Sequence, residues 1–285
     1  MNTQAPSDAT DRRPVLVLGA TGKTGRRIAE GLRAADIPVR LGSRSAVPSF
    51  DWGQESTWET CLQGARAVYI NYAPDLAMPG ATDAITALVA RATHHGVEHL
   101  VLLSGRGEEE AQACEAIVQA CGIDWTIVRA SWFNQNFSEG AFLDMVRAGR
   151  VTLPDVDTPE PFVDVDDIAE VVVTALTQPG HRGEVHEVTG PRMLTLNEVA
   201  QALSEATGRI IDYVPVPHEA FVNGVRESGA PQDVVWMLDY LFATVLDGRN
   251  AYLTDGIQRA LGRPPKDFAA YAREMAATGV WSASE

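Results

Sequence analysis

The chain has 285 residues and is 45% hydrophobic, enough to bury the core of one large α/β domain or of a domain with an added lobe. Its formal net charge of −15 argues against a nucleic-acid-binding surface, because such surfaces need clustered Lys and Arg side chains. No run of about 18 apolar residues occurs, so we expect no membrane span, and the polar residues 1–13 predict a disordered lead without the apolar region of a secretory signal.

Cysteine and histidine usage indicates a reducing compartment and no metal site. The three cysteines, Cys61, Cys114 and Cys121, are odd in number and fall in predicted helical segments, which favours the cytoplasm. The six histidines show no metal-ligand spacing, so no metal is predicted.

The most informative segment is a strand-like run, Val15–Leu18, that is followed by three glycines and then by a helical pattern. The spacing Gly19-x-x-Gly22-x-x-Gly25 is typical of the first turn of a dinucleotide-binding unit. There the first glycine permits a tight turn, the second lets the backbone approach a pyrophosphate, and the third lets the helix pack closely on the strand. The free N–H groups at the helix start favour an anion. An ordinary strand–helix turn is the alternative.

The next strand, Ile37–Arg44, indicates which dinucleotide is bound. An NAD site places Asp or Glu at the end of this strand, whereas Ser43 and Arg44 stand there. With Lys23 in the glycine turn, they provide two cations and a hydroxyl for a 2′-phosphate, which predicts NADPH. The alternative is that Arg44 is a solvated residue at a strand end.

Strand-like and helix-like segments then alternate, which predicts a Rossmann-type α/β fold with a doubly wound parallel sheet. We assign residues 14–130 to an NADP(H)-binding domain. Its further predicted strands are Val47–Phe50, Ala65–Ile70, His99–Leu103 and Asp124–Val128, and its predicted helices are Gly80–His95 and Glu108–Ala120.

Beyond this domain the pattern changes, and we assign residues 131–285 to a smaller, mostly helical substrate lobe over the carboxyl ends of the strands. Residues 161–190 are expected to return to the sheet, with Asp166 or Asp167 capping their helix. The predicted helices are Phe133–Ala148, Ile168–Leu176 and Trp236–Phe242, and the predicted strands are Val151–Leu153, Val185–Val188 and Ile210–Val216.

Together these segments resemble the NmrA-like group of atypical short-chain dehydrogenase/reductases, which includes relatives of isoflavone reductase. The resemblance spans most of the chain and rests on residues 19–25, 41–44, 101–104, 125–129 and 131–137. It is closer still to the fungal clavine dehydrogenases of ergot alkaloid biosynthesis, in residues 50–52, 55–58, 132–139 and 261–268. Those relatives reduce an iminium carbon with NADPH, whereas some other family members only sense the cofactor.

The resemblance implies a path for NADPH along the ends of the strands. Phosphate contacts are implied for the glycine turn, whose residues are Gly19, Thr21, Gly22, Lys23, Thr24 and Gly25, with Ser43 and Arg44 near the 2′-phosphate. Asp51 and Trp52 would flank the adenine, and Asn71, Tyr72, Ala73 and Pro74 would follow the ribose linker. Ser104 would approach the nicotinamide, with Trp132, Phe133 and Asn134 on the far side of that ring. For the aromatic residues, ordinary packing is the alternative.

The expected catalytic pair of most short-chain dehydrogenases is absent. None of the six tyrosines has Lys four residues later, so no Tyr-x-x-x-Lys pair can donate a proton. Reduction of an iminium is easier to reconcile with this than reduction of a carbonyl, because the cation accepts hydride and needs no proton at that step. Reduction of an enone or quinone stays open if solvent protonates the enolate.

We assign Ser104 as the candidate catalytic residue. The candidate substrate-binding residues are Trp132, Phe133, Asn136 and Phe137, which would form an apolar wall for a flat or cationic molecule. Glu115 and Asp164 could balance a substrate cation, although surface or capping roles fit them equally.

The sequence thus predicts a cytoplasmic NADPH-dependent reductase, a monomer or homodimer, that transfers hydride to an imine, iminium or activated alkene of a small molecule, with secondary metabolism as the suggested setting. Two other classes stay open: a non-catalytic NADP(H)-sensing regulator and a non-redox cyclase or isomerase on the same fold. Consumption of NADPH by a substrate would separate the first class from the others.

Overall fold

A six-stranded parallel sheet forms the centre of the computed structural model, which describes residues 12–282. All but two residues of the predicted disordered lead, residues 1–13, therefore lie outside the described part of the chain. The strand order is β2-β1-β3-β4-β5-β7 and every pairing is parallel, so the predicted Rossmann-type fold is confirmed. The strands are β1 (Val15–Leu18), β2 (Val39–Gly42), β3 (Ala67–Ile70), β4 (His99–Gly105), β5 (Asp124–Ala130) and β7 (Glu184–Val188).

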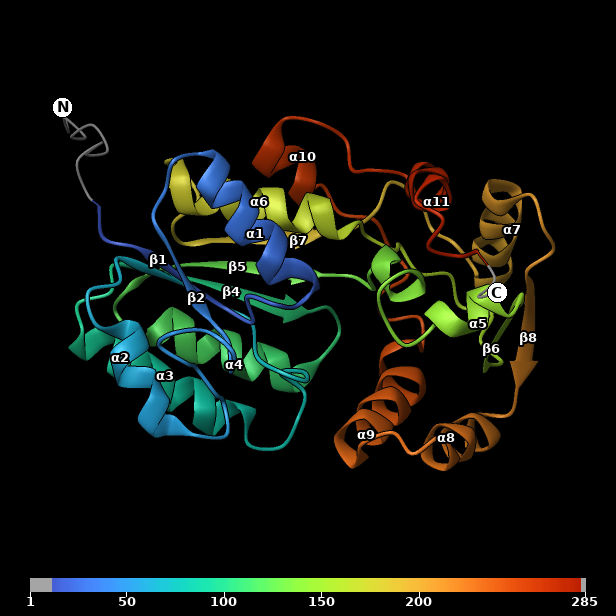
Figure 1. The fold of residues 1–285 in the computed structure, drawn as a ribbon, viewed down its shortest axis with the longest axis horizontal. Helices are drawn as coiled ribbons and strands as arrows, with labels where there is room; N and C mark the ends of the chain where they lie inside the picture. The colour runs from blue at the N-terminus through green and yellow to red at the C-terminus, as the bar shows by residue number, and fades with distance from the viewer. Residues whose placement is uncertain (1–11, 283–285) are drawn as a thin grey trace.

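Helices cover both faces of this sheet (Figure 1). One face carries α1 (Lys23–Ala34), α6 (Val165–Thr177) and α10 (Gly256–Leu261), and the other carries α2 (Trp58–Leu62), α3 (Ala81–His94) and α4 (Glu109–Ala120). Strands β1 and β3 are buried along their whole length, as expected for parallel strands that pack on two sides.

The remaining elements pack beside the carboxyl-terminal edge of the sheet (Figure 1). Here β6 (Arg150–Pro154) and β8 (Asp212–Val216) form a small parallel sheet. The helices around it are α5 (Leu143–Arg147), α7 (Leu196–Thr207), α8 (His218–Glu227), α9 (Gln232–Tyr240) and α11 (Phe268–Ala277). Phe137, Phe162 and Phe268 lie at the centre of their shared core.

The predicted strand over Val47–Phe50 is wrong. These residues form an irregular loop after β2 that closes through the amide of Phe50, which donates to the carbonyl of Ser43 at 2.9 Å. Pro48 has no N–H group to give to a sheet, and the Val47 side chain is 99% exposed. The short segment was predicted to be a strand from its apolar residues, but it contains a proline and does not pair with the sheet.

Two helix predictions also need correction. The single helix expected over Phe133–Ala148 is broken into a short turn, η2 (Asn134–Phe137), and α5, with Gly140 between them. Helix α6 is capped by Asp164, whose carboxylate accepts from the amide of Asp166 at 2.8 Å, and not by Asp166 or Asp167. The capping hydrogen bond that was expected from Asp166 or Asp167 is thus made by Asp164, the residue directly before the helix.

The chain returns to the sheet a second time through α10, in addition to α6 and β7. This contact is close, because a Cβ atom on Gly256 would lie 2.1 Å from the carbonyl oxygen of Glu187 in β7. Within residues 12–282 no helix combines the length and apolar character needed to cross a bilayer. The same residues contain no group of three His, Cys, Asp or Glu side chains arranged to hold a metal ion.

Candidate functional site

The glycine turn has the geometry that a bound phosphate requires. Gly19 has φ +67°, in the left-handed region, and its carbonyl accepts from the amide of Gly22 at 2.8 Å. A Cβ atom on Gly25 would lie 2.2 Å from that same carbonyl oxygen, so only glycine lets α1 begin this close to β1. Gly22 offers no side-chain cap and the first turn of α1 holds no acidic residue, which leaves its N–H groups available to an anion.

The segments predicted to follow the cofactor meet this turn at one edge of the sheet. The amide of Ala20 donates to the carbonyl of Gly42 at 3.3 Å, directly before Ser43. The indole of Trp52 donates to the carbonyl of Asn71 at 3.1 Å. The Asn71 side chain in turn lies against Gly19, where a Cβ atom would be 2.7 Å from its amide nitrogen.

Arg44 lies at this edge, and its charge is unpaired among the described residues. Its side chain is exposed and has no hydrogen bond or ion pair with any described residue. Thr21 is also exposed, and Ala73 is exposed beside Pro74. The carboxylate of Asp51 instead accepts from the amide of Gly53 at 3.0 Å, which fixes the local turn.

Packing already accounts for part of the predicted cofactor set. The Trp52 ring lies 5.4 Å from that of Trp58 and 4.9 Å from that of Tyr72, so it belongs to an aromatic cluster over α2. The hydroxyl of Thr24 points into the core, where it accepts from Tyr69 at 2.9 Å. The Thr24 hydroxyl is therefore turned away from the start of α1, and only the Thr24 backbone is available there.

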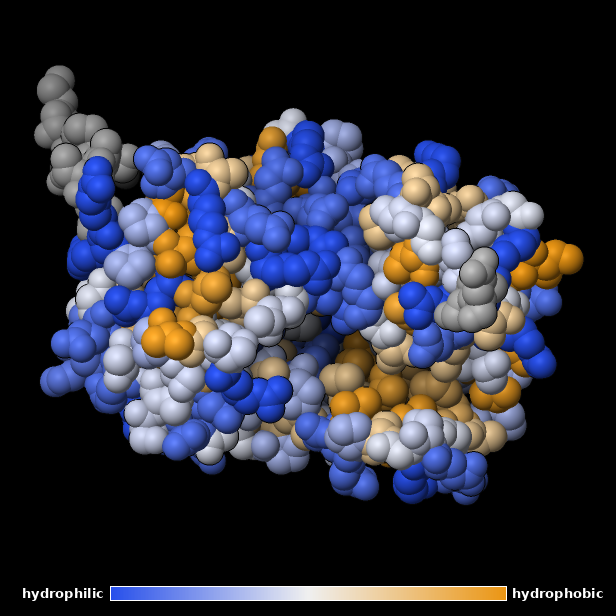
Figure 2. All heavy atoms as spheres, viewed as in Figure 1, coloured by the Kyte–Doolittle hydropathy of each residue, from blue (hydrophilic) through white to orange (hydrophobic). Residues whose placement is uncertain are grey.

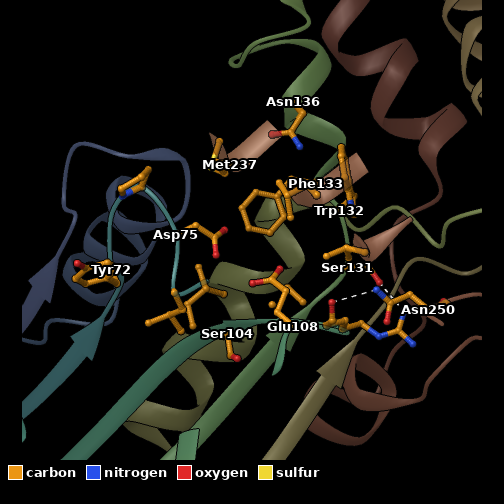
Figure 3. Close-up of a pocket in the computed structure, with 18 of the residues that line it drawn as sticks. Tyr72, Asp75, Ser104, Glu108, Ser131, Trp132, Phe133, Asn136, Met237 and Asn250 are labelled. Atoms are coloured by element: carbon orange, nitrogen blue, oxygen red, sulfur yellow. Dashed lines mark hydrogen bonds between the residues drawn. The ribbon is translucent and has the colours of Figure 1, made fainter. Parts of the chain in front are cut away.

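A cavity of about 250 Å³ begins at the glycine turn and runs between the sheet and the second group of elements (Figures 2 and 3). Eight predicted site residues line it: Lys23, Asn71, Tyr72, Pro74, Ser104, Trp132, Phe133 and Asn136. Lys23 lies beside Gly140, where a Cβ atom would be 3.1 Å from the Lys23 Nζ. Burial lowers the pKa of this ammonium, and the nearby Glu139 carboxylate opposes that shift.

Phe137 does not belong to the cavity, so we withdraw it from the substrate-binding set. Its side chain is fully buried, with ring centroids 5.3 Å from Phe142 and 5.8 Å from Phe268. The indole of Trp281 donates to its backbone carbonyl at 2.8 Å. Because the predicted helix is broken, the Phe137 side chain packs into the hydrophobic core around β6 and β8. Trp132 and Phe133 line the cavity instead.

Ser104 lines the cavity, but its proton is committed elsewhere. The hydroxyl donates to Glu115 Oε1 at 2.6 Å, and Arg129 Nε donates to the same oxygen at 2.9 Å. Ser104 can therefore accept a hydrogen bond from a bound molecule, while Glu115 is already paired and does not face a substrate cation.

Arg106 is a buried cation that the sequence reasoning missed. It is 2% exposed and donates to Glu187 at 2.9 Å and to the Ser131 hydroxyl at 2.9 Å. Its guanidinium also reaches the carbonyls of Asn250 and Tyr252, each at 3.2 Å. The charge is thus matched by Glu187, and the residue ties the end of β4 to a distant part of the chain.

Three carboxyl groups, Asp75, Glu108 and Glu160, also line the cavity and were not predicted. Burial raises the pKa of Asp75, and it raises that of Glu160 to about 7. Burial and the charge of Asp75 hold the pKa of Glu108 well above its usual range. Asp75 and Glu160 lie in irregular segments without a motif, and Glu108 looked like one more acid at a helix start.

The parallel sheet, the glycine turn and the adjoining cavity define a Rossmann-type α/β protein. The NmrA-like family matches residues 49–261, and the chain belongs to this family.

Similar proteins extend over nearly the whole chain. Agroclavine dehydrogenase of Claviceps fusiformis is 30% identical over 290 residues, covering 94% of this chain and 98% of its own length. The NAD(P)H azoreductase of Xenophilus azovorans is 29% identical and covers 92% and 98%. The similarity to clavine dehydrogenases expected from the motifs is therefore confirmed.

A solved structure of an Escherichia coli NADPH-dependent quinone oxidoreductase in complex with NADPH shares the fold. It superposes with a TM-score of 0.77 at 19% identity, covering 92% of this chain and 99% of that chain. The named relatives and this neighbour are all oxidoreductases.

Proposed function

We propose that the chain is an NADPH-dependent reductase that transfers hydride to an imine, iminium or activated alkene of a small organic molecule. The observation that carries this proposal is the continuity of the glycine turn with the cavity. Lys23 belongs to the turn and lines the cavity, and Asn71 lines the cavity while its side chain lies against Gly19. The relatives support the same chemistry, since their names describe a dehydrogenase, an azoreductase and a quinone oxidoreductase. NADPH, when bound, supplies the hydride.

In this proposal the chain's own residues bind and orient the cofactor. The turn from Gly19 to Gly25 and the start of α1 would hold the pyrophosphate. Arg44, which has no partner among the described residues, would pair with the 2′-phosphate, and Ser43 would accompany it. Asp51 and Trp52 would border the adenine. Asn71, Tyr72 and Pro74 would contact the ribose linker between the adenine and the nicotinamide, which would lie near Ser104.

The far end of the cavity would hold the substrate. Trp132 and Phe133 provide aromatic faces, and Asn136 provides an amide beside them. Cation–π attraction at such a wall contributes about 0.5–2 kcal/mol. Together with the acidic lining, it favours a flat molecule that is cationic or becomes cationic. The three cysteines, all free, suit the reducing cytoplasm that we propose as its location.

Two measurements test the proposal. Calorimetric titration with NADPH and NADH should show binding with a clear preference for NADPH, and absence of binding to either would contradict the cofactor site. NADPH oxidation should then be followed with an N-alkyl iminium salt, an imine, an enone, a quinone and an azo dye. Tight NADPH binding without oxidation by any acceptor would favour the sensing regulator instead.

A further inference from the structure

Two carboxyl groups from separate segments meet inside the cavity. Asp75 comes from the loop after β3, and Glu108 directly precedes α4. Figure 3 shows their carboxyl groups turned toward each other. Glu108 is buried at 5% exposure, and its Oε2 has no hydrogen-bond partner among the described residues. A buried carboxyl oxygen that faces a cavity without a hydrogen-bond partner costs stability, so it calls for a functional reason.

The surrounding backbone is shaped to hold this pair. A Cβ atom on Gly105 would lie 2.1 Å from Glu108 Oε1, so the glycine after Ser104 makes the room that the carboxyl group occupies. Asp75 Oδ1 accepts from the amide of Ala77 at 2.8 Å. The hydrogen bond stabilises the charged form of Asp75, whereas Glu108 has no such donor.

The charges around the pair leave one proton on it. Asp75, Glu110 and Glu115 all act on Glu108 with negative charge, and Glu160 lines the same cavity. Among the described residues, two cations line the cavity: Arg106 is paired with Glu187, and the charge of Lys23 is influenced by the nearby Glu139 carboxylate. Two adjacent carboxyl groups in such a site do not both ionise. Such a pair favours one shared proton, and the backbone donor to Asp75 favours placing that proton on Glu108.

We propose that Glu108 is the proton donor of the reduction and that Asp75 is the positioning residue that keeps it protonated. The inference rests on the proposed function. In the step, the C=N bond of a neutral imine gains a C–H bond from the hydride of the reduced nicotinamide cofactor. The π electron pair moves to nitrogen and forms an N–H bond with the proton of Glu108. The imine is thereby reduced and the nicotinamide is oxidised. The Glu108 carboxylate regains a proton from the solvent, and the amine and the oxidised cofactor leave.

This assignment supplies the proton source that the missing Tyr-x-x-x-Lys pair leaves open. It also predicts that substrates differ in their dependence on Glu108. A neutral imine or quinone needs the proton, whereas an N-alkyl iminium salt accepts hydride without one. The two kinds of acceptor therefore separate proton donation from every other contribution of the side chain.

Infrared spectroscopy tests the protonated state without any turnover. Spectra are recorded in H₂O and D₂O at about pH 8.5, above the pKa of about 7 of Glu160. The wild type should show the C=O band of a buried protonated carboxyl group, with its shift on deuteration. Glu108→Gln should remove the band and Glu160→Gln should keep it. A wild type without the band, or a band that survives Glu108→Gln, would overturn the proposal.

Kinetics test the donor role on the folded protein. Glu108→Gln should lower kcat with a quinone or neutral imine by about 10²-fold or more, the scale of general acid catalysis. With an N-alkyl iminium salt its kcat should stay within about threefold of the wild type. Asp75→Asn should keep activity but move the fall of kcat at high pH to lower pH, because Glu108 then loses its proton more readily. Glu109→Gln, an exposed neighbour in the first turn of α4, serves as the control and should change neither.

The outcomes distinguish this inference from the proposed function. Equal losses with neutral and cationic acceptors in Glu108→Gln would show a structural role and overturn the donor assignment alone. Unchanged activity in that variant would overturn it in the same way. A wild type that binds NADPH and keeps the infrared band, yet reduces no acceptor, would overturn the donor role and the proposed function together.

Discussion

The glycine-turn edge and the cavity beyond it are built in different ways. At the edge, backbone groups within a few residues of each other make the site, and Gly19, Gly22 and Gly25 set its shape. In the cavity, side chains from segments far apart in the sequence make the site, as Asp75, Glu108 and Glu160 show. The difference explains why a local motif predicted the glycine-turn edge, whereas no motif predicted the carboxyl groups of the cavity.

The comparison predicts the largest effect on cofactor affinity at the glycine turn, where the backbone has no room for a side chain. Gly25→Ala places a methyl group 2.2 Å from the carbonyl oxygen of Gly19, so the turn must open. We expect NADPH affinity to fall at least about 100-fold, or about 2.7 kcal/mol, by calorimetry. Gly224→Ala in α8, where the added methyl group meets nothing within 4 Å, is the matched control and should leave affinity unchanged. Unaltered binding in Gly25→Ala would mean that the turn does not hold the cofactor.

A second prediction separates cavity wall from core. Phe137→Ala removes a fully buried ring and should lower the free energy of unfolding by about 3–5 kcal/mol in urea titrations. Trp132→Ala, at the cavity wall, should cost less stability and raise KM for the acceptor. A Phe137→Ala protein of normal stability with a raised KM would restore Phe137 to the substrate site.

The third prediction concerns pH. The pKa of Glu160 is raised from 4.5 to about 7, so its contribution to stability is present below about pH 4.5 and is lost as pH rises through about 7. The wild type should therefore lose up to about 3 kcal/mol of unfolding free energy across this window through Glu160. Glu160→Gln should lack that loss when urea unfolding is compared at about pH 5 and about pH 8. An identical pH dependence in both proteins would show that Glu160 does not titrate there.

The smallest expected effect sharpens the choice of cofactor. Arg44→Ala removes one charge-assisted contact, worth about 1.5–3 kcal/mol, so NADPH affinity should fall about 10- to 100-fold. NADH affinity should stay within about threefold, because NADH has no 2′-phosphate. Equal losses for both cofactors, measured by fluorescence titration, would contradict the role given to Arg44.

Sequence periodicity predicted the fold well because the strands of a parallel sheet are continuous apolar runs. Val15–Leu18 was found in this way, and it pairs with β2 and β3 in the sheet. Prediction failed where the pattern was short or interrupted. Val47–Phe50 is apolar yet lies in a loop, and the helix expected through Gly140 breaks there.

The candidate site was predictable only where a motif is local. Eight of the proposed residues line the cavity, from Lys23 to Asn136. Arg106, Glu160 and Asn250 were missed because they act through burial and through contacts that join distant segments. Ser104 lines the cavity, but its hydrogen bond to Glu115 depends on how α4 packs against β4.

Transfer of deuterium from NADPH tests the central claim most directly. NADPH deuterated at both C4 positions of the nicotinamide is mixed with the protein and an N-alkyl iminium salt or an enone, and the product is examined by mass spectrometry and NMR. If the glycine-turn edge and the cavity form one reductase site, the product carries one deuterium on carbon. NADPH that binds but is not consumed, or a product without carbon-bound deuterium, would contradict the account.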